Sequence, residues 1–227
     1  MKMKKFHDRK LTFVDEDTLI DEYGNPIMKG WEEEWMSKSA EIVCQNGGSI
    51  LNIGYGLGLI DKFIQTYNIS HHTIVESHPD VHKKIMEDGW LEKPNVTVVM
   101  KKWQDYFPYI TKKFDGIYFD AYDILAPMDA GGQGFLQVFI PNLHKILKPD
   151  GVFSFWPGPI FETHRAFHIQ WRNNLAAALQ PTFTLEKQIF NYSNTETSNK
   201  RFKDIKTSSY TVPVITYRKT PSIPSLI

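Results

Sequence analysis

Between about residues 47 and 157, short apolar runs alternate with longer segments whose apolar residues recur at helical spacing. Short continuous apolar runs are typical of strands that are buried on both faces, and the longer periodicity is typical of amphipathic helices. The alternation therefore predicts a parallel sheet with helices on both faces. The predicted strands are 49–54, 72–77, 96–100, 114–120 and 151–156, and the predicted helices are 57–68, 78–90, 103–110 and 134–151.

The two ends of the chain follow other patterns. Residues 165–179 have helical spacing, and the β-rich runs 183–190 and 208–217 follow with no helix between them, which predicts an antiparallel hairpin at one sheet edge. Residues 1–46 are interpreted as an N-terminal arm and helix, and 47–227 as the main domain. The predicted fold class is α/β and Rossmann-like, with a mostly parallel seven-stranded sheet.

Composition and charge narrow the class of protein. The chain has 26 lysines and arginines and 26 aspartates and glutamates, so no basic field is expected to attract nucleic acid. Its single cysteine, Cys44, excludes an internal disulfide and a cysteine metal cluster, and we expect it to be a buried apolar residue. No apolar run is long enough for a membrane span, and the basic start has no apolar signal segment. We expect a cytoplasmic protein.

A glycine-rich turn follows the first predicted strand. Gly54 suits a tight turn, Gly56 allows close approach of a ligand, and Gly58 opens the next helix. Ordinary turns also contain glycines, so the stronger sign is Glu76, which ends the second strand, where an acid accepts hydrogen bonds from ribose hydroxyls. The alternative for Glu76 is a solvated carboxylate.

The nature of the nucleotide depends on spacing and on a third element. Dinucleotide sites favour G-x-G-x-x-G, whereas G-x-G-x-G here suits a nucleoside without a pyrophosphate. Trp103, Gln104 and Asp105 follow the third strand, where an adenine would lie, although Trp103 also suits a core position. These elements together predict S-adenosylmethionine, with S-adenosylhomocysteine as product, and disfavour a nicotinamide-dependent oxidoreductase.

The fourth strand ends in Asp120, which is followed by Tyr122 and Asp123, at the edge that faces the reactive end of such a cofactor. The chain lacks Asn-Pro-Pro-Tyr and carboxylates at metal spacing, which disfavours nucleobase and metal-bound catechol acceptors. A guanidinium is a planar donor that carboxylates bind in bidentate pairs. A second carboxylate could come from residues 32–34, but neighbours on a helix point about 100° apart, and a solvated first turn is the simpler interpretation.

Paired histidines suggest no metal site. His78 with His82, and His164 with His168, have helical spacing but no third ligand. We expect capping or surface roles for them, and no metal cofactor.

The combination GNPIMKGWEEEWM, ILNIGYGLGLID, IVESHPDV, WQD, FDGIYFDAY and LKPDGVFSF resembles the guanidino N-methyltransferases. This family includes guanidinoacetate N-methyltransferase and a fungal protein arginine N5-(delta-)methyltransferase, and the resemblance covers about residues 11–157. It implies a class I S-adenosylmethionine-dependent methyltransferase whose arm closes over the site. The resemblance implies catalytic roles for Asp120 and Glu32 and substrate contacts by Trp31, Glu32, Asp120 and Tyr122. The implied cofactor contacts are Met28, Met36, Gly54, Tyr55, Gly56, Leu57, Gly58, Leu59, Ile60, Glu76, Ser77, His78, Lys102, Trp103, Gln104 and Asp120.

The acceptor segments depart from the family pattern at 121–135 and 157–168. Because the fungal protein also has an N-terminal region that is missing here, the expected acceptor is free arginine or a small arginine-like guanidine. Protein arginine and guanidinoacetate are the alternatives. More distant ones are an aminopropyltransferase and a non-catalytic S-adenosylmethionine-binding module. No nucleic-acid or membrane partner is expected, and the sequence leaves monomer and homodimer open.

Overall fold

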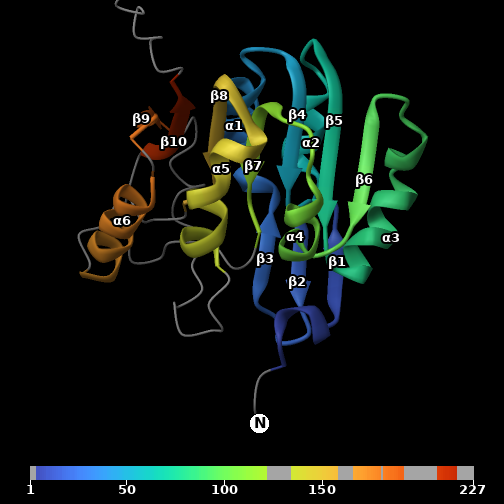
Figure 1. Cartoon of the computed structure of the whole chain (residues 1–227). Helices are drawn as coiled ribbons and strands as arrows, with labels where there is room; N and C mark the ends of the chain where they lie inside the picture. Colours follow the sequence, from blue (N-terminus) through green and yellow to red (C-terminus); the bar gives the residue numbers. More distant parts are fainter. Residues whose placement is uncertain (1–3, 122–133, 158–165, 180, 192–208, 219–227) are drawn as a thin grey trace, which may run out of the picture.

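A seven-stranded sheet forms the centre of the computed structural model, which describes residues 4–121, 134–157, 166–179, 181–191 and 209–218 (Figure 1). Its strand order is β6-β5-β4-β7-β8-β10-β9, parallel from β6 to β8, with β10 antiparallel to both of its neighbours. The predicted fold class, including the edge hairpin, is confirmed. The strands are β4 (Gly48–Ile53), β5 (Ile69–Glu76), β6 (Val96–Met100), β7 (Phe114–Phe119), β8 (Leu147–Phe155), β9 (Phe183–Asn191) and β10 (Ser209–Tyr217).

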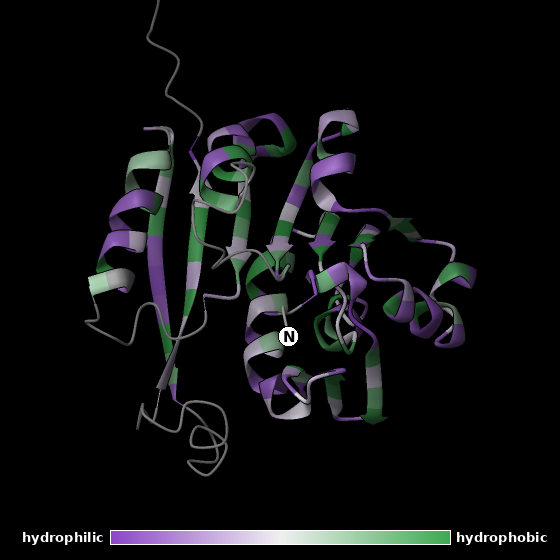
Figure 2. Ribbon diagram, turned by 90° about the horizontal axis from the view of Figure 1, so that it is seen from below, coloured by the Kyte–Doolittle hydropathy of each residue, from purple (hydrophilic) through white to green (hydrophobic). Residues whose placement is uncertain are grey.

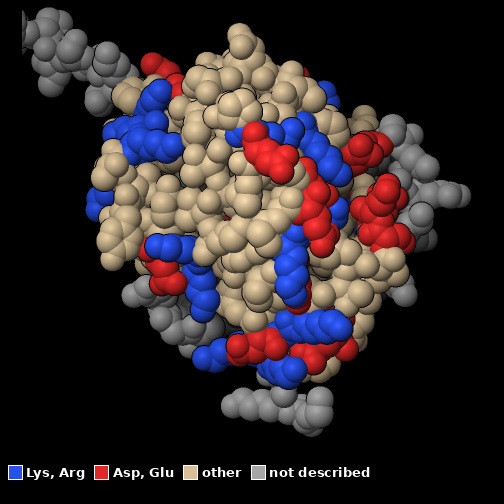
Figure 3. Space-filling view, turned by 90° about the vertical axis from the view of Figure 1, so that its right-hand side faces the viewer, with Lys and Arg blue, Asp and Glu red and all other residues tan. Residues whose placement is uncertain are grey.

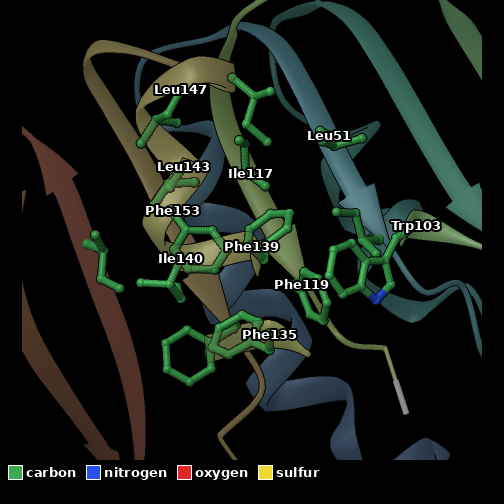
Figure 4. Close-up of a cluster of buried hydrophobic side chains, with 14 of the residues drawn as sticks. Leu51, Trp103, Ile117, Phe119, Phe135, Phe139, Ile140, Leu143, Leu147 and Phe153 are labelled. Carbon is green, nitrogen blue, oxygen red and sulfur yellow. The ribbon is translucent and has the colours of Figure 1, made fainter. Parts of the chain in front are cut away.

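Helices cover both faces of this sheet. Buried residues of α1 (Glu33–Cys44), α2 (Leu59–Ile64) and α3 (Pro79–Glu87) pack together on one face, called the α1 face below. On the opposite face, α4 (Trp103–Tyr106), α5 (Ile140–Ile146) and α6 (Ala166–Ala178) contribute to a second core, shown in part in Figure 4. A π-helical turn (Phe135–Phe139) precedes α5, so the long helix predicted over 134–151 is divided and ends at Ile146. Short 3-10 turns are η1 (Phe6–Asp8), η2 (Gly30–Glu32), η3 (Trp90–Glu92) and η4 (Phe107–Tyr109).

The central strands are apolar on both faces, as a parallel sheet requires. Ile117 and Phe119 of β7 enter the second core, while Tyr118 between them packs on the α1 face. Green bands of apolar residues therefore dominate these strands in Figure 2, and the helices carry more of the hydrophilic residues. This alternation decides which side chains after each strand share a face.

The arm is more ordered than the sequence predicts. Residues 11–29 form a second, antiparallel sheet of β1 (Leu11–Asp15), β2 (Thr18–Asp21) and β3 (Pro26–Lys29), which sequence reasoning missed because the strands are short and only partly buried. Figure 1 shows this sheet next to the ends of β4 and β5 toward which their arrows point. The arm therefore lies at the carboxyl edge of the parallel strands.

Polar contacts fix the arm to α3. The backbone N–H of Leu11 donates to Asp80 Oδ2 (3.0 Å), and His78 Nε2 donates to the Arg9 carbonyl oxygen (2.9 Å). Arg9 also forms a buried ion pair with Asp21 at 3.2 Å, within the arm. The N-terminal end of α3 thus holds the arm next to the end of β5.

Lysine, arginine and acidic side chains are interspersed on the face shown in Figure 3, in agreement with the formal net charge of zero. No helix among the described residues is both long and apolar enough to cross a membrane.

Candidate active site

The glycine turn lies where β4 and β7 end side by side. Gly54 has φ +97°, and a Cβ atom there would lie 2.3 Å from the Asp120 carbonyl oxygen. A Cβ on Gly56 would lie 2.5 Å from Met28 Sδ, and this sulfur accepts a hydrogen bond from the Leu57 N–H at 3.2 Å. Gly54 is thus required by its close approach to the backbone at the end of β7, whereas Gly56 faces the flexible Met28 side chain of the arm and has φ +57°, which favours glycine. Gly58, with φ +70°, is the N-cap of α2, as predicted.

The Glu76 carboxylate is fixed by backbone donors. Its Oε2 accepts from the Tyr55 N–H at 2.9 Å, and its Oε1 accepts from the N–H groups of Ser77 (2.6 Å) and His78 (2.7 Å). Glu76 ends β5 and is 8% exposed, so the alternative of a solvated carboxylate is wrong. A carboxylate oxygen has two lone pairs, so Oε2 has capacity for a further donor such as a hydroxyl.

A buried network of polar side chains supports the glycine turn from β4, α2 and β5. Asn52 Nδ2 donates to the Gly54 carbonyl oxygen (2.9 Å) and to Asp61 Oδ1 (2.8 Å), and His72 Nε2 lies 3.1 Å from the same Asp61 oxygen. The Gln65 amide approaches His72 Nδ1 at 3.2 Å. Sequence reasoning missed this network, although a polar residue inside the apolar run at Asn52 is a signal for it.

Tyr55 has a structural role in addition to its backbone contact. Its hydroxyl donates to Asp88 Oδ2 at 2.9 Å, and its ring lies edge-on to Trp90 at 6.0 Å. Burial, with contributions from Asp61 and Asp88, raises the pKa of this hydroxyl far above its ordinary value. Leu57, Leu59 and Ile60 are buried in the core on the α1 face, so they shape the turn through packing.

The turn after β6 combines exposed and buried residues. Lys102 is exposed, and its carbonyl oxygen accepts from the N–H groups of Asp105 and Tyr106, which starts α4. Trp103 is 5% exposed and lies edge-on to Phe119 (5.5 Å) and Phe139 (5.6 Å), as Figure 4 shows. Its core interpretation is confirmed. Gln104 is half-buried in the same turn.

His78 and Ser77 join the site to the arm. His78 is fully buried, and its Nδ1 accepts from the Asp80 N–H at 3.2 Å, so it caps α3 as the capping interpretation predicts. Ser77 Oγ lies 3.4 Å from Nδ1 of His7 in η1. Burial lowers the pKa of His7, with smaller effects in the same direction from Lys102 and His78, while Glu76 and Asp8 act against it. The influence of Glu76 and Lys102 places His7 near the ends of both β5 and β6, a position that sequence reasoning missed.

Two carboxylates converge around Tyr118 on the α1 face. Burial raises the pKa of the Tyr118 hydroxyl well above its ordinary value, the negative charges of Asp120 and Glu32 raise it further, and the nearby Ser39 hydroxyl acts in the opposite direction. The Tyr118 hydroxyl also donates to Met36 Sδ at 3.5 Å. Tyr118 was missed from sequence, although alternation along β7 puts it on the same face as Asp120.

The structure separates the three adjacent glutamates. Glu32 is 2% exposed and its Oε1 accepts from the Lys29 N–H at 3.1 Å, whereas Glu33 is exposed and Glu34 is half-buried. The interpretation as a solvated first turn therefore holds for Glu33 and is wrong for Glu32. Trp31 is half-buried beside Glu32, and Asp120 is half-buried after β7. Tyr122 lies outside the described residues.

The arrangement combines a glycine turn of close backbone approach with a buried carboxylate that N–H groups hold. Two further carboxylates act on Tyr118, whose hydroxyl contacts Met36 Sδ. No group of three or more His, Cys, Asp or Glu side chains that could hold a metal occurs among the described residues. Cys44 is buried at the end of α1, as expected, and burial raises its pKa to about 12.

Comparison with known structures identifies the fold. Spermidine synthase from Thermotoga maritima superposes with a TM-score of 0.62 and 15% identity, over 90% of this chain and 66% of that one. An rRNA methylase from Streptococcus thermophilus has a TM-score of 0.51 and 10% identity, over 82% of this chain and 95% of that one. At these identities the likeness establishes the Rossmann-like fold alone.

Comparison of sequences identifies the family. Protein arginine N-methyltransferase 2 of Yarrowia lipolytica is 38% identical over 159 residues, which are 66% of this chain and 32% of that protein. Its namesake from Aspergillus fumigatus is 37% identical over 158 residues, 68% of this chain and 36% of that protein. The chain thus spans about a third of the length of these relatives. The profile of the guanidinoacetate N-methyltransferase family matches residues 2–157, and the chain belongs to this family.

Proposed function

We propose that the protein is an S-adenosylmethionine-dependent N-methyltransferase that acts on a guanidino group, with free arginine or a small arginine-like guanidine as acceptor. One observation carries the proposal: Asp120 shares a face with Tyr118, whose buried hydroxyl contacts Met36 about one helical turn after the buried Glu32. Two carboxylates from segments far apart in the sequence thus lie near the same hydroxyl, and both raise its pKa. Paired carboxylates suit the planar donor array of a guanidinium.

The residues present fit the cofactor. Gly54 and Gly56 provide a turn whose backbone a Cβ would obstruct, and Glu76 offers an oriented carboxylate for ribose hydroxyls. Residues Lys102–Gln104 would border the adenine, with the buried Trp103 as the fixed base of that turn. Met28 and Met36 would border the thioether end. When bound, S-adenosylmethionine supplies an electrophilic methyl group and leaves as the neutral thioether.

Glu32 and Asp120 would orient the acceptor so that one guanidino nitrogen points its lone pair at that methyl carbon. The nitrogen becomes more acidic once it is alkylated, and Asp120 accepts the proton that it releases. Glu32 is held by the Lys29 N–H, which suits an orienting role.

The test is methyl transfer to defined guanidines. The purified protein is incubated with S-adenosylmethionine and free arginine, guanidinoacetate or an arginine-containing peptide, and products are identified by fragmentation mass spectrometry. Asp120→Asn should lower kcat by roughly 100-fold to 10,000-fold, the range of general acid–base contributions, while cofactor affinity is retained. Cofactor binding with no methylated guanidine in the wild type, or an unchanged kcat in Asp120→Asn, contradicts the proposal.

A protein arginine acceptor is the second candidate, because the relatives at 37–38% identity are named protein arginine N-methyltransferases. The peptide in the same assay decides between them. Preference for the peptide over free arginine would favour this second candidate.

A further inference from the structure

Trp156 lies next to Asp120 at the end of the neighbouring strand. Phe119 is paired with Phe155, and the N–H of Trp156 donates to the Phe119 carbonyl oxygen at 3.1 Å. Asp120 and Trp156 are therefore in equivalent positions, each one residue beyond its strand.

Alternation puts both side chains on the same face. Phe153 and Phe155 of β8 enter the second core, so Ser154 and Trp156 belong to the α1 face. Trp156 packs there against the clusters that contain Met28, Met36 and Tyr118 on one side and Trp35 on the other. It thus borders the group of residues around the two carboxylates.

A row of aromatic rings fixes the orientation of Trp156. Its ring lies 5.9 Å from Trp35, which stacks on Tyr210 at 5.2 Å, and Tyr210 lies 5.7 Å from Phe190. Trp35 is 2% exposed and lies one helical turn after Glu32, whereas Trp156 is only partly buried. The row therefore ends in Trp156, whose indole is held on one side by α1 and whose ring nitrogen is buried, while the residue as a whole is only partly buried.

We propose that Trp156 is a specificity-determining residue of the acceptor site, where its indole ring provides the flat surface on which the guanidinium plane stacks. This inference rests on the proposed function. A guanidinium donates hydrogen bonds from its edge and is weakly hydrated on its faces, so two carboxylates at the edge and one aromatic face complement it. Among aromatic side chains, tryptophan gives the strongest cation–π contact.

The test compares three variants by steady-state kinetics with arginine. Trp156→Leu should raise the KM for arginine roughly 3-fold to 30-fold, the range that corresponds to this cation–π contact, while kcat and the Kd for S-adenosylhomocysteine stay within about twofold. Trp156→Phe keeps a weaker aromatic face and should raise KM by only about twofold to threefold. Trp171→Phe is the matched control, because it shortens a buried indole that contacts Phe135 and Phe155 in the other core.

The outcomes separate this inference from the proposed function. An active wild type whose KM for arginine is unchanged in both Trp156 variants overturns the inference alone. Equal losses of kcat, cofactor affinity and thermal stability in Trp156→Leu, with no rescue by phenylalanine, indicate a packing role and also overturn it. A wild type that methylates no guanidine contradicts the proposed function, and the inference falls with it. If the leucine variant does not fold, the phenylalanine variant still decides.

Discussion

The two halves of the candidate site are built from different parts of the chain. The glycine-turn half comprises Gly54–Gly58, Glu76 and the turn Lys102–Gln104, and its main contacts are backbone N–H groups within one βαβ unit and its successor. The carboxylate half comprises Glu32, Tyr118, Asp120 and Trp156, and it relies on side chains from η2, β7 and the end of β8. Backbone geometry fixes the first half locally, whereas the second exists only when distant segments are packed together.

The largest expected effect follows from a contact that joins the two halves, the approach of Gly54 to the Asp120 carbonyl oxygen. In Gly54→Ala the new Cβ atom would collide with the Asp120 carbonyl oxygen. Residue 54 would also have to keep a positive φ, which is unfavourable for alanine. We expect a combined strain of about 2 kcal/mol or more in the folded protein, which is relieved by displacing the glycine turn and the end of β7. Cofactor affinity and kcat should therefore both fall. Isothermal titration with S-adenosylhomocysteine and steady-state kinetics measure the two effects.

Gly24→Ala is the matched control for that variant. Gly24 has φ +78°, but a Cβ atom added there would have no neighbouring atom within 4 Å, so it tests the conformational strain without the collision. It should melt at a slightly lower temperature and retain binding and turnover. A folded Gly54→Ala protein with unchanged affinity and kcat would show that the two halves are not coupled through this contact.

A smaller effect should separate the halves. Glu76→Gln removes the charge that three N–H groups orient, and it should weaken cofactor binding roughly 10-fold to 100-fold, since a hydrogen bond to a charged group contributes about 1.5–3 kcal/mol. Glu32→Gln should instead raise the KM for arginine by a similar factor. Glu76→Gln should change the KM for arginine by no more than about threefold, and Glu32→Gln should change cofactor affinity by no more than about threefold.

Glu33→Gln is the control for Glu32→Gln, because Glu33 is the exposed neighbour and should change neither constant. The double variant Glu76→Gln with Glu32→Gln should show additive free energies if the halves are independent. If either single variant raises both constants equally, the division into two halves is wrong.

The same difference explains what the sequence could predict. Gly58 as the start of α2 and Glu76 as the end of β5 follow from local pattern, because glycine and strand-end preferences act over a few residues. The burial of Glu32 and the exposure of Glu33 depend on where η2 meets the sheet, which spacing along a helix cannot determine. Resemblance to a family selected Glu32 where local physics did not.

The residues that were missed have no local motif. Tyr118 and Trp156 look like ordinary apolar positions of their strands. Alternation along β7 relates Tyr118 to Asp120, but only the pairing of β7 with β8 shows that Trp156 shares a face with them. The arm sheet was missed for a related reason, since its short strands are stabilised by contacts with α3 and the glycine turn more than by their own pattern.

The smallest predicted effect concerns pH and the glycine-turn half. The pKa of His7 is lowered when the arm is docked. Below about pH 6.5, His7 therefore takes up a proton more readily when the arm is detached than when it is docked. Docking of η1 is therefore fully favourable above that pH and weakens as the pH falls. The charged and titratable groups that act on His7 are Lys102, His78, Glu76 and Asp8.

We expect the Kd for S-adenosylhomocysteine to rise a few-fold between pH 7.5 and pH 5.5, and His7→Gln to remove most of that rise, because glutamine can still contact Ser77 but does not titrate. His71→Gln is the matched control: the pKa of His71 is also lowered by burial, but His71 lies near the start of β5, away from Glu76, and its replacement should leave the pH dependence intact. A pH dependence that persists in His7→Gln would place the titrating group elsewhere and would separate the arm from the glycine-turn half. If the pH dependence disappears in His7→Gln alone, η1 belongs to the glycine-turn half. The arm then contributes to both halves of the site, through His7 to the glycine-turn half and through Glu32 to the carboxylate half.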